Sequence, residues 1–153
     1  HYPFEPDVIT SAKALRVGAT IAREEVFPDE RSRLSSTWGA GDLLSSAMGV
    51  VTIDAIEQYD LMEHATRQGR AFKEHFRDAG LPGLTDVRGK GLMLAVEFES
   101  TELGEAIQAA AFERGLMVLA CGERTIRLLP PLDVTTHEVE IAVDRFTEAV
   151  EAA

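Results

Sequence analysis

Residues 6–15 read PDVITSAKAL, a short β-branched run that ends at Lys13. Only three lysines, Lys13, Lys73 and Lys90, occur in the 153 residues, and the other twelve basic residues are arginines. A desolvated lysine can lose its proton and act as a nucleophile, whereas arginine stays protonated. The placement of Lys13 therefore suits chemistry that needs a neutral amine. From its local sequence alone, a strand-end lysine that simply reaches solvent is the more common case.

The residues around this stretch predict short strands followed by long helices. Up to residue 80, we expect a buried strand over residues 8–12, a strand over 20–22, a helix from the N-cap Asp42 to about Tyr59, and a helix over 61–79. The Gly-Leu-Pro-Gly sequence at residues 80–83 ends the last helix and is the clearest boundary in the chain. We therefore predict two domains, covering residues 1–80 and 81–153.

The part after this boundary predicts a small α+β unit. We expect strands over residues 91–98, 116–120 and 125–129, and helices over 101–114 and from Thr135 onward. Thr135 and Glu138 have the spacing of a capping box. Residues 86–91 are interpreted as a tight structural turn. The resulting order is β-α-β-β-α, with the helices on one face of an antiparallel sheet.

Composition limits the function classes. Hydrophobic residues make up 45% and charged residues 27%, which is typical of a globular chain. The net charge of -11 argues against nucleic-acid or membrane partners. The single Cys121 excludes an internal disulfide and favours a cytoplasmic protein. The chain starts at His1 in what reads as mid-chain sequence, so we expect a fragment of a longer protein.

Three features could carry chemistry, and each has an ordinary structural alternative. Lys13 could hold an aldehyde cofactor such as pyridoxal phosphate as a Schiff base. Residues 35–41, Ser-Ser-Thr-Trp-Gly-Ala-Gly, could bind an anion before the next helix, or simply cap that helix. Arg127 lies in an apolar strand and could bind a carboxylate, although a structural salt bridge is the better interpretation from spacing alone. The four histidines show no metal-ligand spacing.

Four stretches together resemble the class III pyridoxal-phosphate-dependent aminotransferases, which include the 4-aminobutyrate, ornithine and lysine 6-aminotransferases. They are PDVITSAKA (residues 6–14), RLSSTWG (33–39), DVRGKGLM (86–93) and TIRLLPPL (125–132). They occur in family order over nearly the whole chain. The Ser-Thr-Trp-Gly sequence is most similar to the lysine 6-aminotransferase branch. The resemblance implies an α/β fold: the C-terminal part of a fold-type I transferase, with the end of the large cofactor domain followed by a small α+β domain.

The resemblance also implies roles for individual residues. Lys13 matches the lysine that forms the aldimine with pyridoxal 5'-phosphate and then moves the proton. Thr37, assisted by Ser36, matches the residue that binds the cofactor phosphate of the neighbouring subunit in a homodimer. Arg127 matches the arginine that binds the α-carboxylate of the substrate. The implied substrates are an amino acid donor of the lysine, ornithine or 4-aminobutyrate type and a 2-oxo acid acceptor.

The resemblance is incomplete in one respect. The family's acidic residue for the pyridine nitrogen and its main phosphate loop lie upstream of the matching lysine, in an N-terminal half that has no counterpart here. We therefore expect little or no transaminase activity from this chain alone. Two alternatives stay open at this point: a catalytically incomplete fragment that acts as a folded or dimerising module, and a related aminomutase or decarboxylase.

Overall fold

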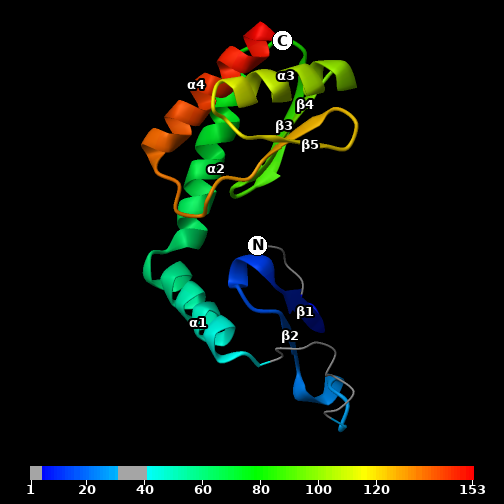
Figure 1. Ribbon diagram of the computed structural model, residues 1–153, viewed down its shortest axis with the longest axis vertical. Helices are drawn as coiled ribbons and strands as arrows, with labels where there is room; N and C mark the ends of the chain where they lie inside the picture. Colours follow the sequence, from blue (N-terminus) through cyan, green and yellow to red (C-terminus); the bar gives the residue numbers. More distant parts are fainter. Residues whose placement is uncertain (1–4, 31–40) are drawn as a thin grey trace. The chain divides into compact units, whose positions relative to one another are not determined.

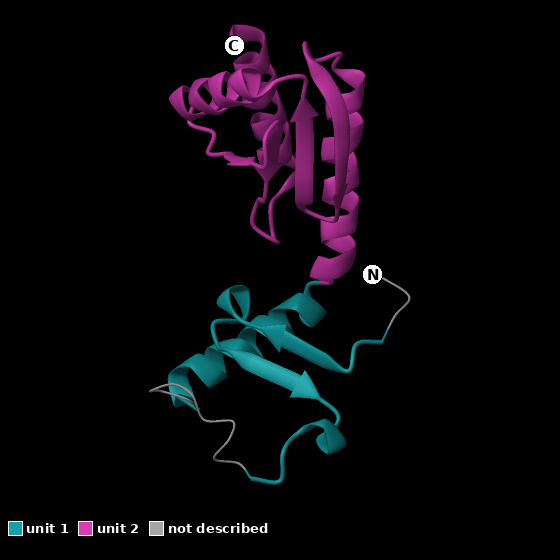
Figure 2. Ribbon diagram, turned by 90° about the vertical axis from the view of Figure 1, so that its right-hand side faces the viewer, with its two compact units in different colours: residues 1–59 teal, residues 60–153 magenta. Residues whose placement is uncertain are grey.

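The structure is a computed structural model that describes residues 5–30 and 41–153. The chain forms two compact units, residues 1–59 and residues 60–153 (Figure 2). None of the helices in the described part of the chain has the length and apolarity that a bilayer span requires.

Unit 1 is built around a two-stranded antiparallel sheet (Figure 1). Strand β1 (Val8–Ser11) pairs with β2 (Ala19–Ala22), and Thr10 lies opposite Thr20. The short 3-10 helices η1 (Lys13–Leu15) and η2 (Glu24–Val26) follow the two strands. Both predicted strands are confirmed. The prediction that the first one is buried is wrong for the described residues, because Val8 and Ile9 remain 45% and 46% exposed.

Helix α1 (Leu43–Gln58) completes the described part of unit 1. Asp42 caps it as predicted, since the carboxylate accepts a hydrogen bond of 2.7 Å from the Ser45 N–H. This bond to the backbone lowers the pKa of Asp42 below its usual value. Gly49 is the only buried residue of this helix. Apolar side chains such as Leu43 and Leu44 extend into solvent around the rest of it.

Unit 2 contains a four-stranded antiparallel sheet with the order β3-β4-β6-β5. The strands are β3 (Leu84–Lys90), β4 (Met93–Phe98), β5 (Leu119–Cys121) and β6 (Thr125–Leu128). The sequence-based interpretation of residues 86–91 as a turn is wrong, because most of them belong to β3. Gly89 and Gly91 in that segment hid its strand pattern. From residue 84 onward the observed order of elements is therefore β-β-α-β-β-α, in place of the predicted β-α-β-β-α.

Three helices cover one face of this sheet, and the other face is open to solvent. They are α2 (Leu61–Asp78), α3 (Thr101–Glu113) and α4 (Thr136–Ala152). Between helices and sheet lies an apolar core in which the ring of Phe146 packs 5.0 Å from that of Phe76 and 6.3 Å from that of Phe98, centroid to centroid. The predicted capping box of Thr135 and Glu138 is confirmed at the start of α4.

Packing divides the chain earlier than the sequence pattern does. Helix α2 lies against β3 and α4, so the unit boundary falls between Tyr59 and Asp60 rather than after residue 80. The Gly-Leu-Pro-Gly sequence at residues 80–83 ends a helix but separates no packed layers. The assignment of residues 1–80 to a cofactor-binding domain stays a prediction, since backbone packing says nothing about what a unit binds.

Candidate functional site

Lys13 occupies a strained turn directly after β1. Its φ is 51°, and that of Arg16, three residues later, is 67°. Residues other than glycine seldom adopt this left-handed conformation, and it is concentrated at functional sites. The Arg16 N–H donates a 2.8 Å hydrogen bond to the Lys13 carbonyl and closes the turn. The chain thus keeps a bulky residue in a conformation that a glycine would adopt more easily.

The segment that follows Lys13 packs against Gly49 of α1. A Cβ built on Gly49 would lie 2.8 Å from Cγ1 of Val17 and 3.4 Å from the carbonyl oxygen of Leu15. The helix therefore approaches the segment after Lys13 more closely than any residue with a side chain would allow. This close approach, rather than the strand pair alone, fixes the position of the turn within unit 1.

The Lys13 side chain is exposed and has no hydrogen-bond or ion-pair partner among the residues that the structure describes. Lys73 differs, because its ammonium group donates a 3.2 Å hydrogen bond to the carbonyl of Gly89. Lys13 is therefore presented on a fixed turn with its amine available for a ligand. Ser36 and Thr37, the predicted phosphate ligands, lie outside the described residues, so their role stays a prediction.

Arg127 lies on the open face of the sheet in unit 2. Its neighbours in β6, Ile126 and Leu128, are buried under the helices, and Arg127 itself is exposed on the opposite side. In the adjacent strands Ala95 and Leu119 lie opposite it. The salt bridge expected from spacing alone is absent from the described residues, where Arg127 has no ion-pair partner. Its guanidinium is thus available to an external anion.

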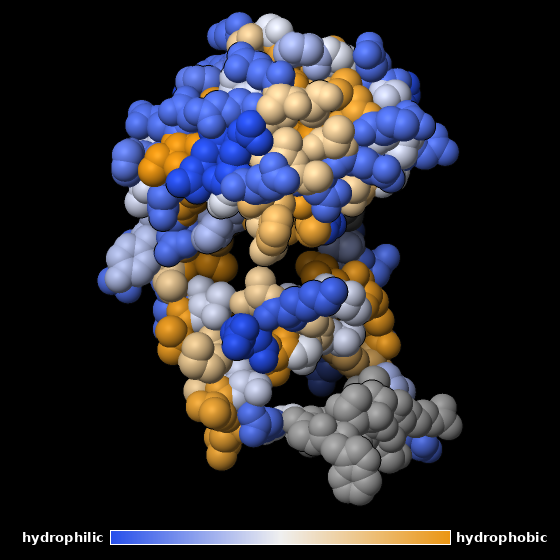
Figure 3. Space-filling view, turned by 45° about the horizontal axis from the view of Figure 1, so that its top comes forward, coloured by the Kyte–Doolittle hydropathy of each residue, from blue (hydrophilic) through white to orange (hydrophobic). Residues whose placement is uncertain are grey.

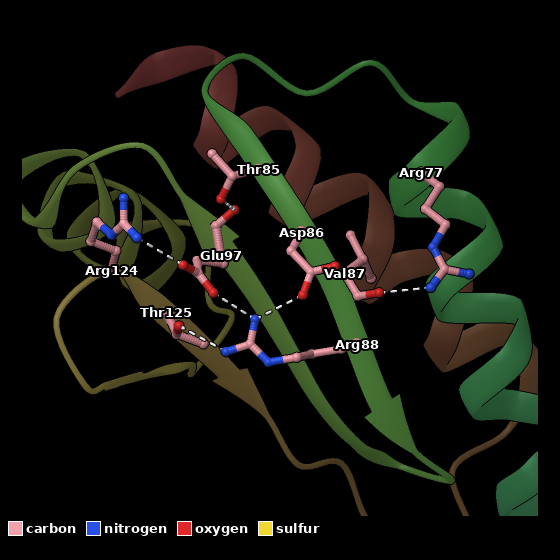
Figure 4. Close-up of polar contacts among 8 residues, drawn as sticks. All are labelled: Arg77, Thr85, Asp86, Val87, Arg88, Glu97, Arg124 and Thr125. Carbon is pink, nitrogen blue, oxygen red and sulfur yellow. Dashed lines mark hydrogen bonds and ion pairs between the residues drawn. The ribbon is translucent and has the colours of Figure 1, made fainter.

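A charged network occupies the same face and was not predicted from the sequence. Arg88 donates hydrogen bonds of 2.9 Å to Asp86 and 2.6 Å to Glu97, and Glu97 also accepts one of 3.1 Å from Arg124 (Figure 4). The carboxylates of Asp86 and Glu97 raise the pKa of Arg88 above its already high value. The sequence signal for this network is the alternation of charged and apolar residues in β3, which the interpretation of residues 86–91 as a turn overlooked.

Unit 2 also contains an apolar hollow of about 500 Å³ near the start of α4. Its lining includes Phe72, Met117, Leu129, Pro130 and Val134. Arg127 does not line it, although the following residues do. Across residues 5–30 and 41–153, no three histidine, cysteine or carboxylate side chains gather closely enough to hold a metal ion. Of the predicted site residues, the structure describes Lys13 in unit 1 and Arg127 in unit 2.

Comparison with known proteins finds relatives of this chain among the aminotransferases. Acetylornithine aminotransferase of Bacillus subtilis (strain 168) is 34% identical over 98% of this chain. The solved structure of ornithine aminotransferase PY00104 from Plasmodium yoelii is 28% identical over 99% of it, with a TM-score of 0.86. That of Toxoplasma gondii ornithine aminotransferase, which shows partial occupancy of pyridoxal phosphate at its active site, shares the fold at 23% identity over 96% of this chain, with a TM-score of 0.84.

The chain spans only part of each of these relatives. It covers 40% of the Bacillus subtilis protein, 42% of the Plasmodium yoelii chain and 37% of the Toxoplasma gondii chain. The predicted fold class, a portion of a pyridoxal-phosphate-dependent aminotransferase fold, is confirmed by these matches. The family model described as "Aminotransferase class-III" matches residues 1–150. The chain therefore belongs to the class-III aminotransferases.

Proposed function

We propose that this chain forms part of an aminotransferase that uses pyridoxal 5'-phosphate to move an amino group from an amino acid to a 2-oxo acid. One observation carries the proposal: Lys13 is fixed on a strained turn, exposed and without a partner among the described residues. Membership of the family supports it. The cytoplasmic location expected from the single cysteine is part of the same proposal.

The amine of Lys13 fits the cofactor, because it would hold the aldehyde carbon covalently. Ser36 and Thr37 would bind the phosphate of the cofactor in the neighbouring subunit. When bound, pyridoxal phosphate supplies an electron sink for the substrate carbon that loses a proton. Lys13 would take that proton as a base and return it as an acid, which requires the amine to alternate between its neutral and charged forms. An arginine in its place could not do this.

Arg127 would bind the substrate carboxylate. Its planar guanidinium can donate two parallel hydrogen bonds to a carboxylate and so fix the orientation of the amino acid. The absence of an ion-pair partner among the described residues leaves both donors available. For the amino donor we propose the ornithine type, because the named relatives are acetylornithine and ornithine aminotransferases. Lysine and 4-aminobutyrate are the other donors that the sequence motifs imply.

The surface of unit 1 supports a homodimeric enzyme in which this unit is covered by more protein. Figure 3 shows hydrophobic side chains on the surface of unit 1. Leu43 and Leu44 are 86% and 73% exposed, and Val50 and Val51 are each 58% exposed. A helix that is apolar on all sides is usually buried. An exposed apolar surface of this kind is equally compatible with a non-catalytic dimerising module, which is the second candidate function.

Trapping with borohydride separates the two candidates. The purified chain would be incubated with equimolar pyridoxal phosphate, reduced with borohydride and digested for peptide mass spectrometry. We expect the pyridoxyl group mainly on Lys13. The matched variants are Lys13→Arg, which should lose that label, and Lys73→Arg, which removes a half-buried lysine and should keep the label on Lys13. Equal labelling of Lys13, Lys73 and Lys90 would refute the proposed site and favour the dimerising module.

A further inference from the structure

Glu97 and Arg127 are diagonal neighbours on the open face of the sheet. In the pairing of β4 with β6, Ala95 lies opposite Arg127 and Glu97 lies opposite Thr125. Side chains two positions apart on one strand project from the same face, so Glu97 and Arg127 share this face. Diagonal pairs in antiparallel sheets are close enough for long side chains to meet. A glutamate and an arginine in this arrangement are within reach of an ion pair.

Among the described residues no hydrogen bond or ion pair joins these two side chains, and both oxygens of Glu97 are engaged elsewhere. Oε2 accepts a hydrogen bond of 2.6 Å from Arg88, and Oε1 accepts one of 3.1 Å from Arg124. Arg88 is itself fixed by Asp86 at 2.9 Å, and its other nitrogen lies 3.4 Å from the hydroxyl of Thr125. Figure 4 shows these contacts converging on Glu97 from the β3 side and from the turn before β6.

Stability alone is a weak explanation for this network. The side chains of Arg88 and Arg124 are 50% and 47% exposed, and ion pairs between exposed side chains contribute little to folding. Glu97 is less exposed, at 23%, and it receives both guanidinium groups. The network therefore has its clearest effect on the charge of Glu97, which two arginines compensate.

We propose that Arg88 and Arg124 are positioning residues that hold Glu97 away from Arg127, so that Arg127 stays free to bind the substrate carboxylate. The small side chain of Ala95 lies between Arg88 and Arg127 in the register of the sheet and leaves space for the ligand. This inference rests on the proposed function of Arg127. The part of the inference that concerns the engagement of Glu97 and the availability of Arg127 can be tested without measuring catalysis.

The test measures how fast phenylglyoxal modifies each arginine of the intact chain, followed by peptide mass spectrometry. In the unsubstituted chain we expect Arg127 to react faster than Arg88 and Arg124. Arg88→Met frees one oxygen of Glu97, which should then pair with Arg127 and slow its modification about two- to fivefold, the range expected for an exposed ion pair. Arg88→Lys keeps a cation beside Glu97 and should leave the rate of Arg127 unchanged.

The double variant Arg88→Met with Glu97→Gln shows whether the charge of Glu97 causes the slower modification of Arg127. It should restore the original rate at Arg127, because the competing charge is gone, whereas a general disturbance of the sheet would not be reversed. If Arg88→Met does not fold, as judged by circular dichroism, Arg124→Met frees the other oxygen and takes its place. An unchanged rate at Arg127 in the folded single variant, or a slow rate in the double variant, overturns the inference. Failure of cofactor trapping on Lys13 would refute the proposed function without affecting this result.

Discussion

The close packing of α2 on the β3–β4 hairpin gives a sharp test of the structure through Gly69→Ala. Gly69 is buried in the middle of α2. A Cβ built there would lie 2.5 Å from the carbonyl carbon of Gly91 and 3.1 Å from its Cα, and closer still to the carbonyl oxygen. These are backbone atoms of the turn between the two strands. They cannot rotate away as a flexible side chain would, so the helix or the hairpin must shift.

The size of the effect follows from two opposing contributions. Ordinary van der Waals contact begins near 3.4 Å, so the Gly91 carbonyl would have to move by more than about 1 Å, because its oxygen lies closer than its carbon. Overpacking of this kind costs about 1–3 kcal/mol, with the upper end expected for a backbone neighbour. Replacing glycine by alanine inside a helix returns about 0.5–1 kcal/mol. We therefore expect Gly69→Ala to lower the free energy of unfolding by about 1–2 kcal/mol.

Gly104→Ala is the matched control. Gly104 lies inside α3, and a Cβ built on it meets nothing within 4 Å. Only the helix-propensity gain remains, so this variant should be more stable by about 0.5–1 kcal/mol. Urea unfolding of the 153-residue chain, followed by circular dichroism, measures both free energies. A Gly69→Ala protein as stable as the unsubstituted chain would show that α2 and the hairpin are not packed as described.

Three further predictions concern the core, the acid response and the lysine turn. Phe146→Ala, which removes a fully buried ring 5.0 Å from that of Phe76, should cost about 3–5 kcal/mol in urea unfolding. Glu138 accepts a hydrogen bond from the Thr135 N–H, and this bond lowers its pKa. The stabilisation from this bond is complete above the pKa of Glu138 in the unfolded chain and is lost as the pH falls through the lower pKa of the folded chain. The melting temperature of the Glu138→Gln variant should therefore fall less steeply than that of the unsubstituted chain as the pH is lowered into the acid range. Gly49→Val should displace the lysine turn and reduce borohydride trapping in a chain whose unit 2 still melts normally; undiminished trapping would contradict the packing of that turn.

Local signals made much of the fold predictable. The cap at Asp42 and the capping box at Thr135 and Glu138 were recognised because each depends on residues only three positions apart. Strand β3 was missed because Gly89 lies within it and Gly91 follows its end, and a glycine within a strand gives the same pattern as a turn. The sequence suggested a boundary after residue 80, whereas the compact units divide before α2. A helix end is visible in sequence, but the partner of that helix is not.

The candidate site shows the same division between what the sequence predicts and what the tertiary structure adds. The motifs around Lys13 and Arg127 predicted both as site residues, because the type of side chain and the order of the stretches are properties of the chain itself. The strained conformation of Lys13, the approach of Gly49 to its turn and the engagement of Glu97 by two arginines appeared only in the tertiary structure. The sequence by itself determined which chemical groups are present and which local elements carry them. Folding decided which of these groups meet and which remain free, because contacts between distant segments depend on how helices and strands pack and on no single stretch of residues.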